Sequence, residues 1–71
     1  MKEFLEFVAD IMEVSPAEIS ADTEYGEFPQ WDSVMHLQLV MEIEEKYGVE
    51  IPFHKVPEIR TLAEFYSYIE G

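Results

Sequence analysis

Apolar residues recur at every third or fourth position in three stretches of this chain, and nowhere do they alternate at every second position over a useful length. The first spacing places apolar side chains on one face of a helix, whereas the second would place them on one face of a strand. A chain of 71 residues has room for one small domain. We therefore predict a single all-α domain spanning residues 1–71.

Residues that start or stop helices bound the predicted elements. The first helix covers about residues 2–13, and Ser15-Pro16-Ala17-Glu18 is a capping box that predicts a short helical turn. Turn-forming residues indicate irregular chain over residues 22–30. Asp32 is a suitable N-cap and Gly48 a suitable left-handed stop, so the second long helix lies between them.

The last third of the chain is predicted to hold a short and a longer helical element. The proline after Ile51 favours extended backbone over residues 49–52. Pro57 limits residues 53–57 to one helical turn at most. Thr61-Leu62-Ala63-Glu64 is a second capping box and opens the last helix. The inward side chains of that helix are expected to be Leu62, Phe65 and Ile69.

The charge balance excludes several classes of partner. Sixteen acidic residues against four basic ones give a formal net charge of -12. Nucleic acids and anionic membranes are therefore unsuitable partners, because both attract clustered lysine and arginine. A partner with a basic surface is expected instead. The chain has no cysteine, which rules out disulfides and thiol catalysis, and its apolar runs are too short to span a membrane, so we expect a cytoplasmic protein.

The stretch Trp31-Asp32-Ser33-Val34 presents the most suggestive reactive group. Ser33 falls in the first turn of the second predicted helix, where backbone N–H groups lack internal partners and the helix dipole favours negative charge. A phosphate ester on the Ser33 hydroxyl would therefore lie in a favourable field. For an aspartate and a serine alone, an ordinary helix start is the plainer interpretation.

The chain over residues 31–71 resembles the acyl carrier protein family, whose members bear a phosphopantetheine arm on the serine of an Asp-Ser-Leu motif. Asp32-Ser33-Val34 matches that motif, with valine in place of leucine, and the match continues without a gap. Over residues 1–30 the resemblance is looser. The downstream residues that fit the family pattern are Leu37, Leu39, Val40, Glu44, Glu45, Tyr47, Val49-Glu50-Ile51-Pro52, Ile59, Thr61-Leu62 and Tyr68-Ile69.

The resemblance implies a four-helix bundle of the acyl carrier protein type, with three longer helices and a short third one, and no enzymatic activity of its own. It implies that Ser33 carries 4′-phosphopantetheine from coenzyme A, and that Asp32 helps to hold the magnesium ion used in arm transfer. The implied partners are a phosphopantetheinyl transferase, a loading ligase or acyltransferase, and downstream biosynthetic enzymes. The expected working form is a monomer that carries acyl or aminoacyl groups as thioesters.

Three departures from the family pattern bear on the pathway. Phe28-Pro29-Gln30-Trp31 stands where fatty-acid carriers usually have a Leu-Gly approach, and it is more similar to stand-alone carriers of specialised pathways. Met35 and Gln38 occupy positions that are often acidic, and residues 53–57 lack the family's usual acids. We therefore expect a polyketide, nonribosomal peptide or similar pathway. A fatty-acid synthase carrier and a non-covalent acidic helical interaction protein are the alternatives.

The second helix also supplies the predicted docking surface for partners. A helix of about 3.6 residues per turn that starts at Ser33 aligns one stripe of mostly polar side chains, and neighbouring methionines adapt to varied partner surfaces. The predicted docking residues are Val34, Met35, His36, Gln38, Met41, Glu42 and Glu45. The residues of this helix expected toward the core are Leu37, Val40 and Tyr47.

His36 and Trp31 each have two interpretations. His36 lies three residues after Ser33 on the same helix face, which would suit a Ser-His-Asp hydrolase. The chain offers no glycine-rich elbow or evident cleft for such an enzyme, so His36 is expected to flank the arm or contact a partner. Trp31 is expected to close the preceding loop over the core as a hydrophobic staple rather than to touch cargo. The two histidines have no metal-ligand spacing, and no metal site is predicted.

Overall fold

The computed structural model describes residues 1–70, which form three α-helices and two 3₁₀ helices. In chain order these are α1 (Lys2–Met12), η1 (Pro16–Glu18), α2 (Ser33–Tyr47), η2 (Phe53–Glu58) and α3 (Leu62–Glu70). No strand occurs within the described residues, where the only β-type pairing is an isolated bridge. The predicted all-α class, with three longer helices and a short helix between the last two, is confirmed.

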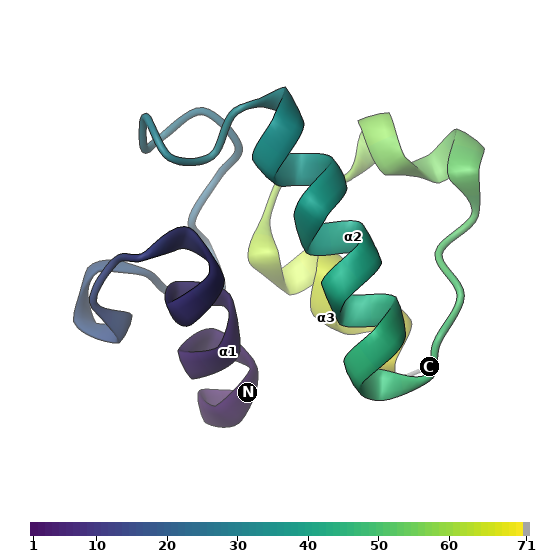
Figure 1. Cartoon of the computed structure of the whole chain (residues 1–71), viewed down its shortest axis with the longest axis horizontal. Coiled ribbons are helices and arrows are strands. Elements are labelled where there is room, and N and C mark those ends of the chain that lie inside the picture. Colours follow the sequence, from purple (N-terminus) through teal and green to yellow (C-terminus); the bar gives the residue numbers. More distant parts are fainter. Residues whose placement is uncertain (71) are drawn as a thin grey trace.

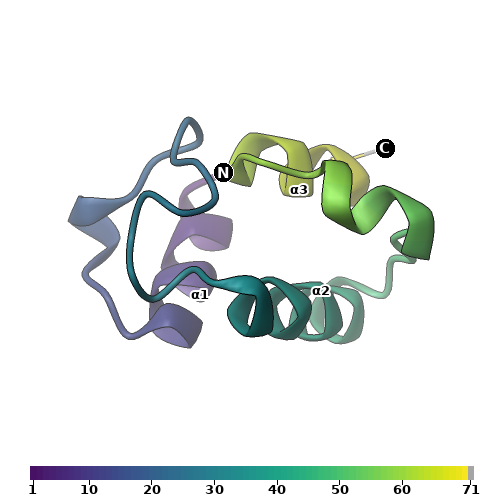
Figure 2. The same ribbon diagram turned by 90° about the horizontal axis from the view of Figure 1, so that it is seen from above.

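The helices surround one core. Figure 1 shows α1 beside α2, with α3 crossing behind α2. Seen from above, α2 and α3 run along opposite sides of the molecule, and α1 and η2 close its two ends (Figure 2). The N-terminus and the end of α3 lie at the end of the molecule opposite the start of α2 (Figure 1).

The predicted helix caps form as the sequence indicated. The Ser15 hydroxyl accepts a backbone N–H bond in the first turn of η1, and its capping box is complete. Asp32 Oδ1 accepts the N–H three residues ahead at 2.9 Å, and Gly48 ends α2 with a φ of 64°. At the start of α3, Thr61 and Glu64 exchange side-chain to backbone hydrogen bonds. These caps fix where each helix begins or ends.

The prediction of one turn at most before Pro57 is wrong. The 3₁₀ helix η2 covers six residues and contains this proline. The Lys55 N–H donates to the Pro52 carbonyl at 2.9 Å, and the Ile59 N–H donates to the Val56 carbonyl at 3.2 Å. Pro57 is the second residue of the Val56–Ile59 turn, where proline is favoured because no N–H is needed there. The helix thus accommodates the proline as a sequence of tight turns.

Side chains from the three α-helices, from η2 and from the connecting loops fill the core. Trp31, Phe4 and Phe65 are among its largest fully buried side chains. Val40 is buried and Tyr47 is partly buried against the core, as predicted. The remaining buried hydrophobic residues are Val8, Ala9, Met12, Ile19, Leu39, Ile43, Ile51, Val56, Ile59 and Leu62.

Backbone hydrogen bonds attach the loop before α2 to the start of α3. The Tyr25 N–H donates to the Arg60 carbonyl at 2.7 Å, and the Leu62 N–H donates to the Thr23 carbonyl at 3.2 Å. Glu24 and Thr61 pair as an isolated antiparallel bridge. Although this loop has no helix, its backbone is therefore held in place, and it carries the Tyr25 ring to the region above the start of α2.

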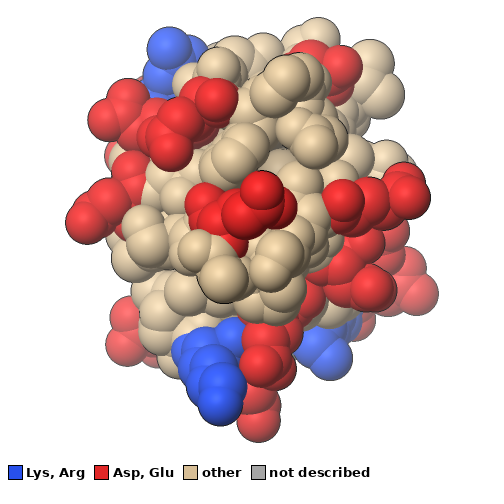
Figure 3. All heavy atoms as spheres, turned by 90° about the vertical axis from the view of Figure 1, so that its left-hand side faces the viewer, with Lys and Arg blue, Asp and Glu red and all other residues tan. Residues whose placement is uncertain are grey.

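On the face formed by α1 and the loop that follows it, acidic side chains cover much more surface than basic ones, among mostly uncharged residues (Figure 3). Within residues 1–70, one ion pair forms, between Lys55 and Glu58 at 3.7 Å. Most acidic groups on the described surface therefore have no cation to neutralise them, which favours encounter with basic partners. No described helix combines the length and the apolar character needed to span a bilayer.

The end of α1 contains a strained residue. Glu13 adopts a left-handed conformation with a φ of 59°, and the Val14 N–H donates to the Ala9 carbonyl at 3.0 Å. This is a Schellman-type ending, in which the left-handed position usually holds glycine because a Cβ atom there costs about 1–2 kcal/mol. The negative charge of Glu13 also opposes the negative end of the helix dipole.

Glu13→Gly is expected to stabilise the domain by about 1 kcal/mol, since it relieves the backbone strain and removes the charge. For a domain of this size, that gain raises the melting temperature by roughly 4–8 °C. Thermal unfolding followed by circular dichroism measures it. Glu13→Ala is the matched control, because it removes the charge and retains the Cβ atom. If the alanine variant is as stable as the glycine variant, backbone strain at this position is not limiting.

Candidate functional site

Ser33 is the first residue of α2, and its side chain is exposed. The other three serines, Ser15, Ser20 and Ser67, each engage their hydroxyl in a local hydrogen bond. The Ser33 hydroxyl makes no hydrogen bond within the described part of the chain. Because the N–H groups of a first helical turn lack intrahelical partners, this free hydroxyl lies in a positive local field. It is therefore suited to carry a negatively charged substituent.

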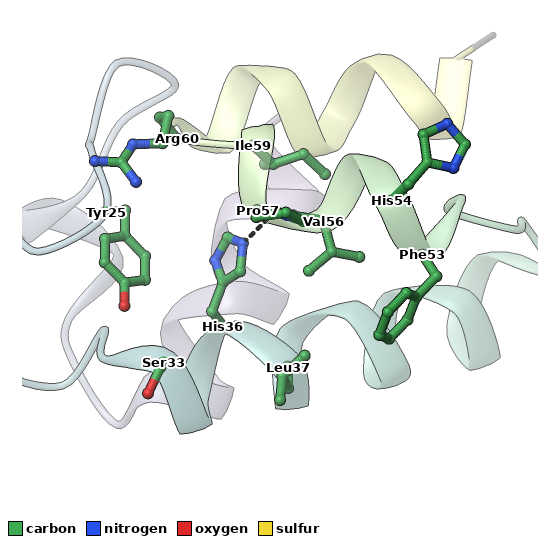
Figure 4. A pocket seen from close by; sticks show the side chains of 10 residues that line it. All are labelled: Tyr25, Ser33, His36, Leu37, Phe53, His54, Val56, Pro57, Ile59 and Arg60. Carbon is green, nitrogen blue, oxygen red and sulfur yellow. Dashed lines mark hydrogen bonds between the residues drawn. The ribbon is translucent and has the colours of Figure 1, made fainter.

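A mostly apolar cavity of about 520 Å³ opens beside Ser33. Figure 4 shows that its walls come from three segments that are far apart in the sequence, namely the loop before α2, the first turns of α2, and η2 with the residues after it. A cavity of this size falls in the range of small-molecule sites. The residues that line it are Tyr25, Ser33, His36, Leu37, Phe53, His54, Val56, Pro57, Ile59 and Arg60.

Asp32 holds the start of α2 in place. Its Oδ1 atom accepts the Met35 N–H at 2.9 Å, and its backbone carbonyl accepts the His36 N–H at 2.8 Å. The carboxylate is exposed next to Ser33, so its second oxygen is open to solvent. In residues 1–70, no three metal-ligating side chains converge on one point. A cation at Asp32 would therefore need further ligands from outside this part of the chain.

His36 does not lie on the docking surface, contrary to the prediction. Only 6% of the residue is exposed, and both ring nitrogens are engaged. The Trp31 Nε1–H donates to His36 Nδ1 at 3.0 Å, so the Nε2–H donates to the Val56 carbonyl at 2.8 Å. Because both ring nitrogens are engaged inside the core, neither is placed to take a proton from Ser33, as a Ser-His-Asp hydrolase would need. His36 does line the cavity beside Ser33.

Trp31 acts as the predicted staple. It precedes the Asp32 cap, and its ring meets the His36 ring edge to edge, with centroids 6.0 Å apart and planes 22° apart. These two residues occupy the positions that a hydrophobic staple joins, one before the cap and one in the second helical turn. Trp31 is 1% exposed, so its hydrogen bond with His36 ties the loop to α2 inside the core.

The exposed face of α2 differs in part from the predicted docking surface. Met35 is half-buried and packs against the core, whereas Leu37, which was predicted to face the core, is 53% exposed. The apolar side chains of Val34 and Met41 are also exposed. We use the name α2 outer face for the hollowed surface lined by Val34, Leu37, Gln38, Met41, Glu42 and Glu45.

Sequence patterns did not indicate seven of the residues that line the cavity, which lie 8 to 27 positions from Ser33 in the chain. These are Tyr25, Phe53, His54, Val56, Pro57, Ile59 and Arg60. Their contribution depends on the packing of the loop and of η2, which no local pattern indicates. Phe53 is 87% exposed although it is large and apolar, a feature that only the structure reveals.

The comparisons with known proteins concern nearly the whole chain. The family model described as a phosphopantetheine attachment site matches residues 2–69. An acyl carrier protein of Rubrobacter xylanophilus is 30% identical over 69 residues, covering 97% of this chain and 85% of that protein. Those of Wolinella succinogenes and a Sulfurovum species are 34% and 35% identical, covering 92% and 93% of this chain, and 86% and 88% of the relatives.

Proposed function

The chain belongs to the acyl carrier protein family, and on that basis we propose that Ser33 is the residue to which its 4′-phosphopantetheine arm is attached. The arm's terminal thiol supplies the chemistry, because it holds an acyl group as a thioester. The observation that carries the proposal for Ser33 is its exposed hydroxyl, which is free of hydrogen bonds at the start of α2 and borders an apolar cavity.

The residues around Ser33 fit such an arm. The first-turn N–H groups of α2 favour a phosphodiester on the Ser33 oxygen, as helix N-termini favour phosphate groups in general. Asp32 fixes the direction of this turn through its bond to the Met35 N–H. The apolar walls from Leu37 and Val56 shield carbon-rich groups from water. These residues orient and protect the attached group, and none performs chemistry on it.

The work of the protein is to raise the local concentration of its cargo. A tethered intermediate meets successive active sites as an effectively intramolecular reactant. The family's partners are a phosphopantetheinyl transferase and the biosynthetic enzymes that load and use the arm. We expect the working form to be a cytoplasmic monomer, because one arm has to visit several enzymes in turn.

The α2 outer face is the proposed docking surface for these partners. It adjoins Ser33, so any enzyme that reaches the Ser33 oxygen has to lie close to it. Exposed Val34, Leu37 and Met41 make it more apolar than a purely acidic face, and Glu42 and Glu45 leave it negative at one edge. Apolar contact should therefore supply much of the affinity, whereas the acids guide encounter.

Met41→Glu is expected to lower the kcat/KM of arm transfer by roughly ten- to a hundredfold, the equivalent of losing one buried apolar side chain from the contact. Glu45→Gln removes one exposed charge and should cost about fivefold or less. Circular dichroism should find both variants folded, since both positions are exposed. A large loss of kcat/KM in Glu45→Gln, together with no change in Met41→Glu, would instead indicate docking through acidic residues.

We also propose that the cargo belongs to a specialised pathway rather than to fatty-acid synthesis. The support is the Phe28-Pro29-Gln30-Trp31 approach to Asp32 and the apolar character of the α2 outer face. Intact-mass measurement of the protein isolated from its native cells tests this. One acyl or aminoacyl species is expected. A ladder of masses that differ by two-carbon units would point to fatty-acid synthesis.

The carrier function itself is tested by coexpression with a broad-specificity phosphopantetheinyl transferase. The intact mass should increase by one phosphopantetheine group, and the new thiol should react with a maleimide, because the chain has no cysteine of its own. An unchanged mass with several transferases would favour the alternative of an acidic helical protein that binds a basic partner without any covalent arm.

A further inference from the structure

One charged side chain lines the cavity beside Ser33, and it is a cation in a strongly acidic protein. Arg60 follows η2 and lies across the cavity from Ser33, with the Tyr25 ring between them (Figure 4). The guanidinium lies 5.3 Å from the centroid of that ring. Of the four basic residues, Lys55 alone forms an ion pair within residues 1–70, and Arg60 alone lines this cavity.

Arg60 makes no ion pair with any residue from 1 to 70. The nearest candidate is Glu64, whose carboxylate instead accepts the backbone N–H groups of Arg60 and Thr61 at 2.8 and 2.9 Å. These bonds, led by the one from the Arg60 N–H, hold the pKa of Glu64 below its ordinary value, and the Arg60 charge contributes least. Glu64 is thus used as a helix cap, and the guanidinium keeps its donors available.

We propose that Arg60 selects cargo with a carboxylate at its far end, which it would meet when the acyl group on the arm enters this cavity. This inference rests on the proposed attachment at Ser33. The cavity walls suit the carbon chain of such an acyl group, and the planar guanidinium suits a carboxylate, which it can bind with two parallel hydrogen bonds. Tyr25 holds the guanidinium against the cavity mouth by a cation–π contact.

The far end of the cargo is better placed to reach Arg60 than the arm's phosphodiester is. A phosphodiester would be attached directly to the Ser33 oxygen, whereas Figure 4 places Arg60 on the opposite side of the cavity. Neutral acyl groups would leave the guanidinium without a partner but would still gain from the apolar walls. Arg60 should therefore discriminate by charge and leave the binding of the carbon chain itself unchanged.

The test compares two six-carbon acyl groups, adipyl with a terminal carboxylate and hexanoyl with a terminal methyl. A broad-specificity transferase attaches each from its coenzyme A thioester to the Ser33 oxygen, releasing adenosine 3′,5′-bisphosphate. The rate at which hydroxylamine cleaves the thioester reports how well the cargo is protected. Arg60→Gln is expected to speed cleavage of the adipyl thioester by about two- to fivefold, as for one partly exposed ion pair, and to leave the hexanoyl rate unchanged.

Lys55→Gln is the matched control. It removes one cation from neighbouring η2, where Lys55 pairs with Glu58 and does not line the cavity. It should change neither rate. An equal response of both thioesters to Arg60→Gln, or no response of either, overturns the role of Arg60. If no acyl-phosphopantetheine is attached to the unchanged chain, the proposed function fails as well, and the intact mass reveals that outcome before any cleavage is measured.

Discussion

Trp31→Ala is expected to lower the free energy of unfolding by about 3–5 kcal/mol, the usual cost of truncating a fully buried tryptophan or phenylalanine. Trp31 is 1% exposed and lies at the junction of the loop, α2 and α3. Its loss would also leave His36 Nδ1 without its donor. A domain of this length has a total stability of about 4–11 kcal/mol, so the variant should lose a large fraction of its stability.

Urea denaturation followed by circular dichroism measures the loss, with Phe53→Ala as the matched control. Phe53 is also a large aromatic residue but is 87% exposed, so its truncation should change stability by about 0.5 kcal/mol or less. Trp31→Phe isolates the hydrogen bond, because it keeps an aromatic ring and removes the donor to His36. Equal stability of Trp31→Ala and Phe53→Ala would contradict the staple that joins the loop to α2.

The helix boundaries could be predicted because short-range chemistry determines them. Ser15, Asp32, Gly48 and Thr61 each satisfy backbone groups within four residues of their own position. Such bonds depend little on the rest of the fold. Glu13 shows the limit of this approach, because the sequence gives no reason to expect a left-handed glutamate at the end of α1.

The faces of α2 were harder to predict than its ends. Apolar residues occur on most of its circumference, so spacing alone does not reveal which of them are buried. Leu39, Val40 and Ile43 are buried against the other helices, whereas Leu37 and Met41 remain exposed. The choice depends on where α1, α3 and η2 pack, which is set by contacts far apart in the sequence.

The part of the candidate site formed by Asp32 and Ser33 could be predicted, whereas the opposite wall of the cavity could not. Asp32 and Ser33 belong to a motif of adjacent residues. The opposite wall requires η2 to pack back toward α2, with the Val56 carbonyl accepting the His36 Nε2–H at 2.8 Å. The same bond explains why His36 is buried although the sequence suggested a surface role.

Ser33→Ala is expected to abolish arm attachment completely, since it removes the oxygen that would form the phosphodiester. Stability should change by about 0.5 kcal/mol or less, because the Ser33 side chain is exposed and makes no hydrogen bond in the described structure. Loss of attachment in a folded variant would therefore report chemistry rather than unfolding. Ser67→Ala is the matched control, as it removes another exposed hydroxyl at a distance from α2.

Peptide mapping of the chain after treatment with coenzyme A, magnesium and a broad-specificity transferase tests the central claim most directly. Mass spectrometry should find one phosphopantetheine group, attached to the peptide that contains Ser33, in the unchanged chain and in Ser67→Ala, and none in Ser33→Ala. Modification of Ser15, Ser20 or Ser67, or an arm that persists in Ser33→Ala, would contradict the assignment of Ser33 as the attachment residue.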